Sequence, residues 1–418
     1  MDKEFEKVFL NKDIFLYSEN NNMFVENKIT LFFIIPFFLD NLFYCEIIKN
    51  LILEATSKLE NNRSIQNELD SLFKTQLDIE TKKYGNSIKL EISLTFINPI
   101  FVYDNNEEYI KKIIFLLLKI VFCMRFDVYD LEMAKNMLVE ELDYNLQMLD
   151  ILNISKFKAI LGEVVKKDEI INKIEILTYQ QVWDFYNCLL ENKIVEMIHI
   201  GSASLSEISG YIDIFFQNKI RNCKNVQKNN HFLVSNYKFD KPLLVLQEDR
   251  IILEYKTPHF TCLKDIFCIW LFALIWGGTP FSKLAINLRD KMGVCYSCSV
   301  DYDLFSDFIF VECAFVNIEE NELKNIIEKY LVEVQEGNFT EQEFVQAKEF
   351  LKNCINNYKI DPDSLERWFN IKYFTGENAS IKEVQKIIDD VSAKEMLERI
   401  KELTLETIYF PQRDINNS

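Results

Sequence analysis

The three histidines of this 418-residue chain are His199, His231 and His259, and no two of them stand at metal-ligand spacing. A zinc hydrolase needs about three protein ligands, commonly including two histidines one helical turn apart. Cys295 and Cys298 form a close cysteine pair, but residues three apart on a regular strand face opposite sides. We therefore expect neither a metal site nor a disulfide from this pair.

Other catalytic patterns are also missing from the sequence. It contains no Gly-x-Ser-x-Gly elbow, no phosphate-binding loop and no Cys–His constellation. An independent hydrolase of another type therefore has little support.

Composition narrows the function classes further. The net charge of -18 argues against nucleic-acid and anionic-membrane surfaces, which need basic patches. The apolar runs at residues 31–39 and 266–276 are shorter than the roughly 20 residues of a membrane span and predict buried core. The first residues lack a basic region followed by an apolar one, so we expect a cytoplasmic protein with reduced cysteines.

A long-period repeat organises the chain. When 213 is added to the numbers of residues 111–142, apolar residues fall on apolar residues in a helical rhythm without a gap. Each copy predicts two helices separated by a short break. The matched pairs are Ile113 and Ile326, Ile114 and Ile327, Leu118 and Leu331, Val121 and Val334, Phe126 and Phe339, Ala134 and Ala347, Lys135 and Lys348, and Leu138 and Leu351.

Strand-like segments precede the helix pair in both halves, so the shared order is strand, helix, strand pair, helix, helix. This order predicts an α+β fold of two tandem homologous domains, each an α/β roll with a mainly antiparallel sheet covered by helices on one face. The predicted strands are residues 29–35, 77–81 and 88–96 in the first half, and 243–247, 251–255, 296–302 and 308–315 in the second. Residues 221–240, within a polar Asn-rich stretch, predict a linker between domains at 1–220 and 241–418.

One stretch resembles a known family closely. Residues 277–299 read GGTPFSKLAINLRDKMGVCYSCS: a Gly-Gly turn, Ser-x-Leu opening a helix, an Arg, and Gly-x-x-Tyr entering a strand. This pattern is similar to the second-half signature of the insulinase (pitrilysin-type) zinc metallopeptidases. Together with the duplication, it most resembles the inactive subunit of the bacterial two-chain type. The first domain would then be a degenerate copy that has lost the zinc motif.

Active members of that family carry His-x-x-Glu-His on the first long helix and a second Glu further along the chain. The corresponding helix here, expected at residues 41–59, contains no histidine. The resemblance places Glu46, Lys49 and Asn50 at the motif positions. Glu132, Glu140 and Glu141 lie where the distant Glu is expected, and without the histidine pair we interpret them as a solvated helix face.

The resemblance also implies roles in the second half. Arg289 and Tyr296 would reach into the partner's active site and bind the scissile carbonyl and its oxyanion, because a guanidinium and a phenol are suitable donors. Gly277 and Gly278 would form a substrate-binding turn at the mouth of the chamber. Taken as residues alone, the two glycines are equally well explained as a helix C-cap.

Two functions remain open from the sequence. The first is a non-catalytic subunit of a heterodimeric zinc peptidase that processes oligopeptides or leader peptides. In that case this chain holds no cofactor, and the zinc belongs to an active insulinase-like partner subunit. The alternative is a scaffold or peptide-binding protein with no proteolytic partner. A neighbouring gene for a chain with His-x-x-Glu-His would separate the two.

Overall fold

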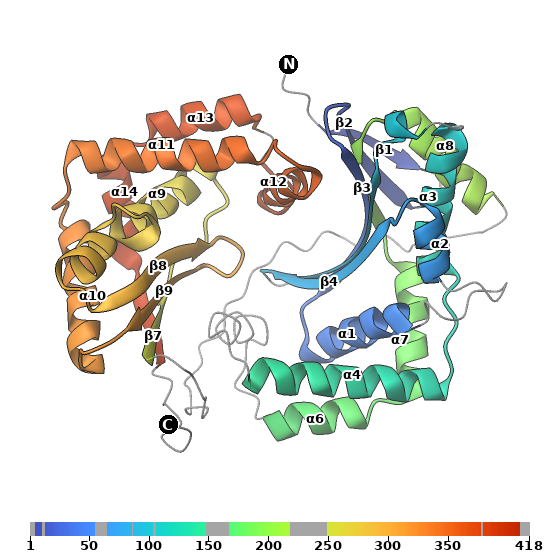
Figure 1. Ribbon diagram of the computed structural model, residues 1–418, viewed down its shortest axis with the longest axis horizontal. Helices are drawn as coiled ribbons and strands as arrows, with labels where there is room; N and C mark the ends of the chain where they lie inside the picture. The colour runs from blue at the N-terminus through green and yellow to red at the C-terminus, as the bar shows by residue number, and fades with distance from the viewer. Residues whose placement is uncertain are drawn as a thin grey trace. The chain divides into compact units, whose positions relative to one another are not determined.

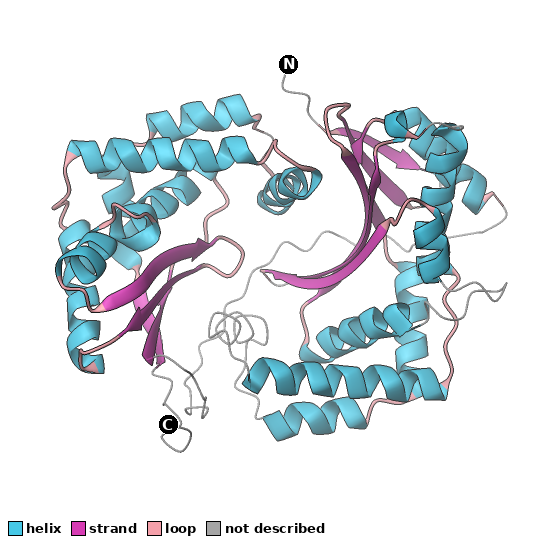
Figure 2. Ribbon diagram, viewed as in Figure 1, coloured by secondary structure: helices cyan, strands magenta, loops and turns pink. Residues whose placement is uncertain are grey.

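The computed structural model describes residues 5–10, 13–54, 65–85, 87–102, 106–147, 167–217, 249–377 and 379–409. The chain divides into two compact units. The first comprises Met1–Leu142, Val165–Val234 and Lys359–Trp368, and the second comprises Asp143–Val164, Ser235–Tyr358 and Phe369–Ser418. Each unit combines helices with one sheet (Figure 2).

The sheet of the first unit has the strand order β1-β2-β6-β3-β5-β4. Neighbouring strands are antiparallel except for β2 and β6, which are parallel. Strand β6, which comes late in the chain of this unit, lies between β2 and β3 from its beginning. The strands are β1 Glu6–Leu10, β2 Ile14–Asn20, β3 Glu26–Pro36, β4 Gln76–Tyr84, β5 Ser87–Ile97 and β6 Val195–Gly201.

Strand β3 shows how the sequence assigns the two faces of this sheet. Ile29, Leu31 and Phe33 alternate along it and lie opposite Leu94, Ile92 and Leu90 of β5, and all are buried. Because side chains alternate between faces, the intervening positions Lys28, Thr30 and Phe32 share the other face with Glu91, Ser93 and Thr95. One face is therefore apolar, and the other carries charges.

Helices cover the apolar face of the first sheet, where α3 and α8 pack together (Figure 1). Each helix buries apolar residues at helical spacing: Ile113, Leu117 and Val121 on α3, and Ile208, Ile212 and Phe216 on α8. The helices of this unit are α1 Leu39–Glu54, α2 Ile65–Ser71, α3 Asn106–Phe122, α4 Val128–Gln147, α6 Lys167–Glu175, α7 Tyr179–Asn192 and α8 Leu205–Phe216, with a short turn η2 at Pro99–Phe101.

The second unit has a sheet with the order β10-β7-β9-β8, antiparallel throughout its described strands. Its strands are β7 Asp249–Lys256, β8 Cys295–Asp303, β9 Phe308–Phe315 and β10 Thr404–Tyr409. Its helical segments are α9 Leu263–Ala273, η3 Leu274–Gly278, η4 Ala285–Lys291, α10 Glu320–Gln335, α11 Glu341–Asn357, α13 Ile381–Asp390, α14 Ala393–Arg399 and η5 Ile400–Glu402. Helix α12, Pro362–Thr375, contributes to both units.

The two sheets repeat one arrangement. The order β6-β3-β5-β4 in the first unit has its counterpart in β10-β7-β9-β8, and α3 with α4 corresponds to α10 with α11. The predicted α+β class and the duplicated order of elements are thereby confirmed. Strands β1 and β2 are additional to the shared part, and the sequence prediction did not include them.

A pair of lysine contacts repeats along with the elements. Lys135 Nζ donates to the carbonyl of Glu175 at 3.1 Å, and Lys348 Nζ donates to the carbonyl of Asp389 at 2.7 Å. Each carbonyl lies at or near the end of a helix, where carbonyl groups lack helical partners and a cation is favourable. The matched lysines therefore have a shared structural role.

The helix that follows each of these carbonyls also begins in the same way. Thr178 caps α7 and Ser392 caps α14, and both caps are capping boxes with the side chain three residues further on. Ile174 and Ile388, which precede the caps, are both fully buried. The duplication thus extends beyond the helix pair in which the sequence revealed it.

The predicted elements differ from the observed ones in a few places. The first long helix is described as Leu39–Glu54 only, and residues 55–64 lie outside the described part. The predicted strand at 243–247 and the predicted linker at 221–240 also lie outside it. Among the helices that the structure describes, none combines the length and the apolar character needed to cross a membrane.

Candidate functional site: a lysine-filled acidic cluster and an exposed Arg–Tyr pair

Helix α1 carries Glu46, Lys49 and Asn50 toward α4. Lys49 Nζ lies 2.8 Å from a carboxylate oxygen of Glu46 and 3.1 Å from one of Glu141, which projects from α4. Asn50 is buried and donates from its amide to the carbonyl of Ala134, also on α4. A lysine ammonium is therefore the cation between the two acidic side chains.

The pKa shifts of Lys49 and Glu46 agree with this arrangement. Burial lowers the pKa of Lys49, but the carboxylates of Glu46 and Glu141 outweigh it and raise the pKa above its usual value. Burial raises the pKa of Glu46, and the Lys49 ammonium counteracts only part of that rise. Lys49 is thus charged at neutral pH and stabilises the ionised form of Glu46.

Of the three acidic residues predicted near the distant metal ligand, only Glu141 reaches this cluster. Glu132 instead pairs with Lys135 at 2.8 Å, and Glu140 is exposed. All three side chains are exposed, in agreement with a solvated helix face, and Glu141 additionally contacts Lys49 of α1. No local sequence signal marks this contact, because Lys49 and Glu141 lie 92 positions apart.

These residues do not fit a zinc ion. Zinc prefers deprotonated nitrogen, sulfur and carboxylate ligands, whereas the ammonium of Lys49 is a positive charge with no lone pair to offer. In the described part of the chain no group of three or more His, Cys, Asp and Glu side chains is placed to hold a metal ion. The cluster is an ion-pair site, and no chemical step passes through a metal here.

The histidines are not at this cluster. His199 lies on β6, fully buried, with Nδ1 3.0 Å from Ser18 Oγ, and burial lowers its pKa to about 4. His259 contacts the Asp307 carboxylate at 2.9 Å in the second unit. The third histidine, His231, lies outside the described residues. His199 is thus a neutral core residue at physiological pH.

In the second unit, the Arg–Tyr segment folds as its sequence predicts. Arg289 lies on η4, Gly293 follows with φ +65, and Tyr296 lies at the start of β8. The positive φ is the left-handed conformation that glycine adopts without strain. The amides of Met292 and Val294 donate back to Asn287 and Leu288, which closes the turn between helix and strand.

Both side chains of the pair are accessible. Tyr296 is 70% exposed, and its hydroxyl makes no hydrogen bond with the described residues. Arg289 Nε donates to the Asp290 carboxylate at 2.8 Å, and its Nη2 donates to the carbonyl of Pro280 at 3.2 Å. The guanidinium is therefore tethered through Nε and Nη2 but remains solvent-exposed.

Close packing against β8 explains why residues 277 and 278 are glycines. A Cβ on Gly277 would lie 2.2 Å from a methyl carbon of Val300, and one on Gly278 would lie 2.8 Å from the Val300 carbonyl oxygen. Both are distances that real Cβ atoms do not tolerate, so the turn presses directly on β8. The two glycines end a π-helical segment, η3, and π-helical turns are frequent at functional sites. Their predicted contact with substrate stays a prediction.

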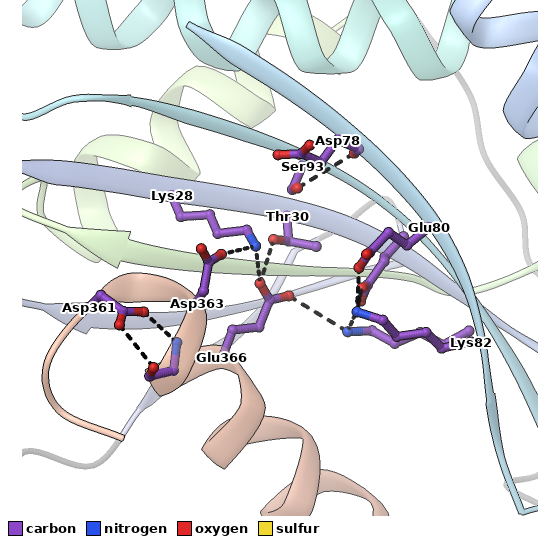
Figure 3. A network of polar contacts seen from close by, with 12 residues as sticks. Lys28, Thr30, Asp78, Glu80, Lys82, Ser93, Asp361, Asp363 and Glu366 are labelled. Atoms are coloured by element: carbon purple, nitrogen blue, oxygen red, sulfur yellow. Dashed lines mark hydrogen bonds and ion pairs between the residues drawn. The ribbon is translucent and has the colours of Figure 1, made fainter. Parts of the chain in front are cut away.

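A buried ionic network covers the polar face of the first sheet, and the sequence did not reveal it (Figure 3). Glu366 of α12 accepts contacts from Lys28 at 2.9 Å and from the fully buried Lys89 at 3.6 Å. Lys89 also contacts Glu91 at 2.5 Å, and Asp363 contacts Lys28 at 2.6 Å. These ion pairs attach the first part of α12 to strands β3 and β5.

The charges of this network are mutually dependent. Burial raises the pKa of Glu91, but Lys89 and Lys82 outweigh it and lower the pKa to about 2. Burial lowers the pKa of Lys28, and Glu366 and Asp363 reverse that effect and raise it. Buried ions of this kind persist only when they are paired. The network therefore has a structural role, which is to hold the first part of α12 on strands β3 and β5.

Comparisons with known proteins agree with this geometry. The model of the Peptidase M16 inactive domain matches residues 177–351. A curated relative, "Probable inactive metalloprotease YmfF" of Bacillus subtilis, is 19% identical over 385 residues, with 87% of each chain covered. A conserved protein from Enterococcus faecalis has a similar fold, with a TM-score of 0.78 and 18% identity over the whole of both chains. A Peptidase M16 inactive domain from Pseudomonas fluorescens has a TM-score of 0.71 at 12% identity, with 98% of both chains covered.

Proposed function

Because this chain belongs to the insulinase-like (M16) peptidase family, among its inactive homologues, we propose that it serves as the non-catalytic subunit of a heterodimeric zinc peptidase. The observation that supports this most is the Lys49 ammonium, which pairs with Glu46 and Glu141 on the helix where the family resemblance places the zinc motif. A chain built in this way needs an active homologue to cut a peptide. That partner subunit would hold the zinc.

In the proposed complex this chain forms half of the peptide-binding chamber. Arg289 and Tyr296 donate hydrogen bonds to the substrate carbonyl in the partner's active site, where negative charge develops in the transition state. Their exposure supports this role, because a side chain that works on another subunit must be accessible. The Gly277–Gly278 turn lines the chamber mouth. The substrates are oligopeptides or leader peptides.

The test uses Arg289→Ala and Tyr296→Phe in the reconstituted pair, with a fluorogenic peptide as substrate. Donors of this kind bind the oxyanion more strongly than the ground-state carbonyl. Each substitution should therefore lower kcat, on the order of 100-fold for the loss of one donor. Dimer fraction and the partner's zinc content should not change.

Matched controls come from the same chain. Tyr129→Phe removes the hydroxyl of another tyrosine with 70% exposure, and Lys291→Ala removes a neighbouring charge on η4. Both controls should keep full activity. Full activity in Arg289→Ala and Tyr296→Phe as well would mean that this chain only forms a wall of the chamber, or acts as a scaffold.

A further inference from the structure

Three cysteines meet on neighbouring strands in the second unit. Cys298 of β8 lies directly opposite Cys313 of β9, and a register shift between Cys295 and Ser297 follows from an extra residue in β8. An extra residue reverses the alternation of side chains on one side of the irregularity. Cys295 and Cys298 consequently face the same way, contrary to the expectation for a regular strand, and both contact the Cys313 thiol.

The three thiols differ in access and in acidity. Cys313 and Cys295 are buried, whereas Cys298 is partly exposed. Hydrogen bonding to the Cys313 thiol lowers the pKa of Cys295, although burial opposes this. Burial, together with hydrogen bonds to Cys295 and Cys298, raises the pKa of Cys313. The cluster thus has one accessible sulfur, one opposing buried thiol and one further buried sulfur that is hydrogen-bonded to that thiol.

The spacing matches a disulfide. Directly opposed residues of antiparallel strands have Cα atoms about 4.5 or 5.5 Å apart, depending on the pair type. A disulfide accepts Cα separations of about 4.4 to 6.8 Å. Cys298 and Cys313 can therefore be joined with side-chain rotation and little movement of the backbone.

We propose that Cys298 and Cys313 are a peroxide-reactive pair, forming a reversible disulfide between β8 and β9 when the protein meets hydrogen peroxide. Among the described residues, no group of three or more His, Cys, Asp and Glu side chains is placed to hold a metal ion, and this includes the three thiols. The bond would fix β8 two residues from Tyr296, at the strand irregularity that positions its side chain.

The reaction balances in two steps. The Cys298 sulfur attacks one peroxide oxygen, so that an S–O bond forms, the O–O bond breaks, and the leaving hydroxide takes the thiol proton to give water. Sulfur loses two electrons and becomes a sulfenic acid, while the peroxide is reduced. The Cys313 sulfur then attacks the Cys298 sulfur. The S–S bond forms, the S–O bond breaks with hydroxide as the leaving group, and the Cys313 proton converts this hydroxide into a second water.

The experiment treats the full chain with hydrogen peroxide under native conditions and maps the disulfides by mass spectrometry. No lysine or arginine lies between Lys291 and Lys324, so trypsin leaves all three cysteines on one peptide, which a second cleavage at Asp303 or Asp307 divides. We expect the loss of two thiols, a link between the Cys298 and Cys313 fragments, and full reversal by dithiothreitol. Cys295 should remain a free thiol.

Variants make the result specific. Cys298→Ser, at a partly exposed position that tolerates a small polar side chain, should abolish the link, and Cys188→Ser, at an exposed cysteine of α7, should leave it unchanged. In Cys313→Ser the oxidation of Cys298 should continue to the sulfinic acid. Absence of the link in the native wild type, or its formation only after unfolding in urea, would overturn the proposal.

Discussion

Lys49 stands where the family resemblance places a general base, yet it acts on its neighbours as a cation. Its ammonium neutralises Glu46 and Glu141, which projects from a different helix. Removing this charge leaves the partly buried carboxylate of Glu46 without its partner, and this costs more than that pair itself contributes. We therefore expect the residue to matter to stability.

We expect Lys49→Met to lower the free energy of unfolding by about 1–3 kcal/mol, because the side chain keeps its length and loses only its charge. The loss should be smaller at pH 5 than at pH 8. Burial already raises the pKa of Glu46, so without Lys49 this carboxyl is protonated more readily and its unpaired charge disappears as pH falls. Urea unfolding measures both effects.

Lys112→Met is the control for this change, since Lys112 pairs with Glu108 at 4.0 Å on an exposed helix surface. Exposed pairs of this kind contribute little. Equal losses in the two variants would show that Lys49 is an ordinary surface lysine.

The buried residue His199 makes the stability of the folded protein depend on pH. Its pKa is about 4 in the folded protein and about 6.5 when unfolded, so between these values only the unfolded state takes up the proton. Its contribution to stability is complete above pH 6.5 and is lost as pH falls toward 4, on the order of 3 kcal/mol in full.

His199→Gln should remove this part of the pH dependence, because glutamine does not titrate. The measurement compares the free energy of unfolding of both proteins at intervals from pH 4 to pH 7.5. The difference between them should vary with pH. A constant difference would mean that His199 is solvated and titrates normally.

At the scale of elements, the start of α12 is held on the first sheet by charge. Glu366 contacts Lys28 and Lys89, and Thr30 Oγ1 donates to it at 3.2 Å (Figure 3). Sequence reasoning missed this fastening because the partners lie more than 270 positions apart and each looks like an ordinary surface charge. The alternation along β3 does place Lys28 and Thr30 on one face, but nothing local indicates which helix covers it.

We expect Glu366→Gln to loosen the first part of α12 without disturbing the sheet. The amide keeps the shape but leaves two lysines with less negative charge, so the free energy of unfolding should fall by about 1–3 kcal/mol. Hydrogen exchange should increase in residues 361–368. Arg367→Gln, on the exposed side of the same helix, should change neither quantity. Unchanged exchange in Glu366→Gln would show that apolar contacts alone hold the helix.

Other elements were readable from the sequence for identifiable reasons. Strand β9 was predicted at its observed bounds because an apolar run there is bordered by turn residues, and α3 with α10 followed from their helical stripes. The irregularity in β8 was not readable, because a single extra residue leaves the apolar pattern almost unchanged. That is why the grouping of Cys295 with Cys298 required the structure.

At the scale of the whole molecule, the duplication favours a further pairing. Each unit repeats one building block of a sheet with helices, and we proposed that a chamber is completed by an active homologue. The co-expressed pair should elute as a heterodimer by size exclusion with light scattering. An obligate interface should bury more than about 2,000 Å² in total.

Metal analysis after dialysis completes this prediction: the isolated chain should hold no stoichiometric zinc, and the pair should hold the partner's. One tightly bound zinc in the isolated chain would contradict the account of Lys49. A chain that stays monomeric beside such a partner would favour the scaffold function.

The ammonium of Lys49 differs from a metal ion in that it is covalently part of the chain. A metal stabilises a fold by mass action, in proportion to its free concentration relative to its dissociation constant, and a chelator removes that contribution. A lysine is always present at one equivalent and cannot be withdrawn. The contact that Lys49 makes between α1 and α4 is therefore independent of metal supply. In the proposed pair, metal depletion that inactivates the zinc-dependent partner should leave this chain folded.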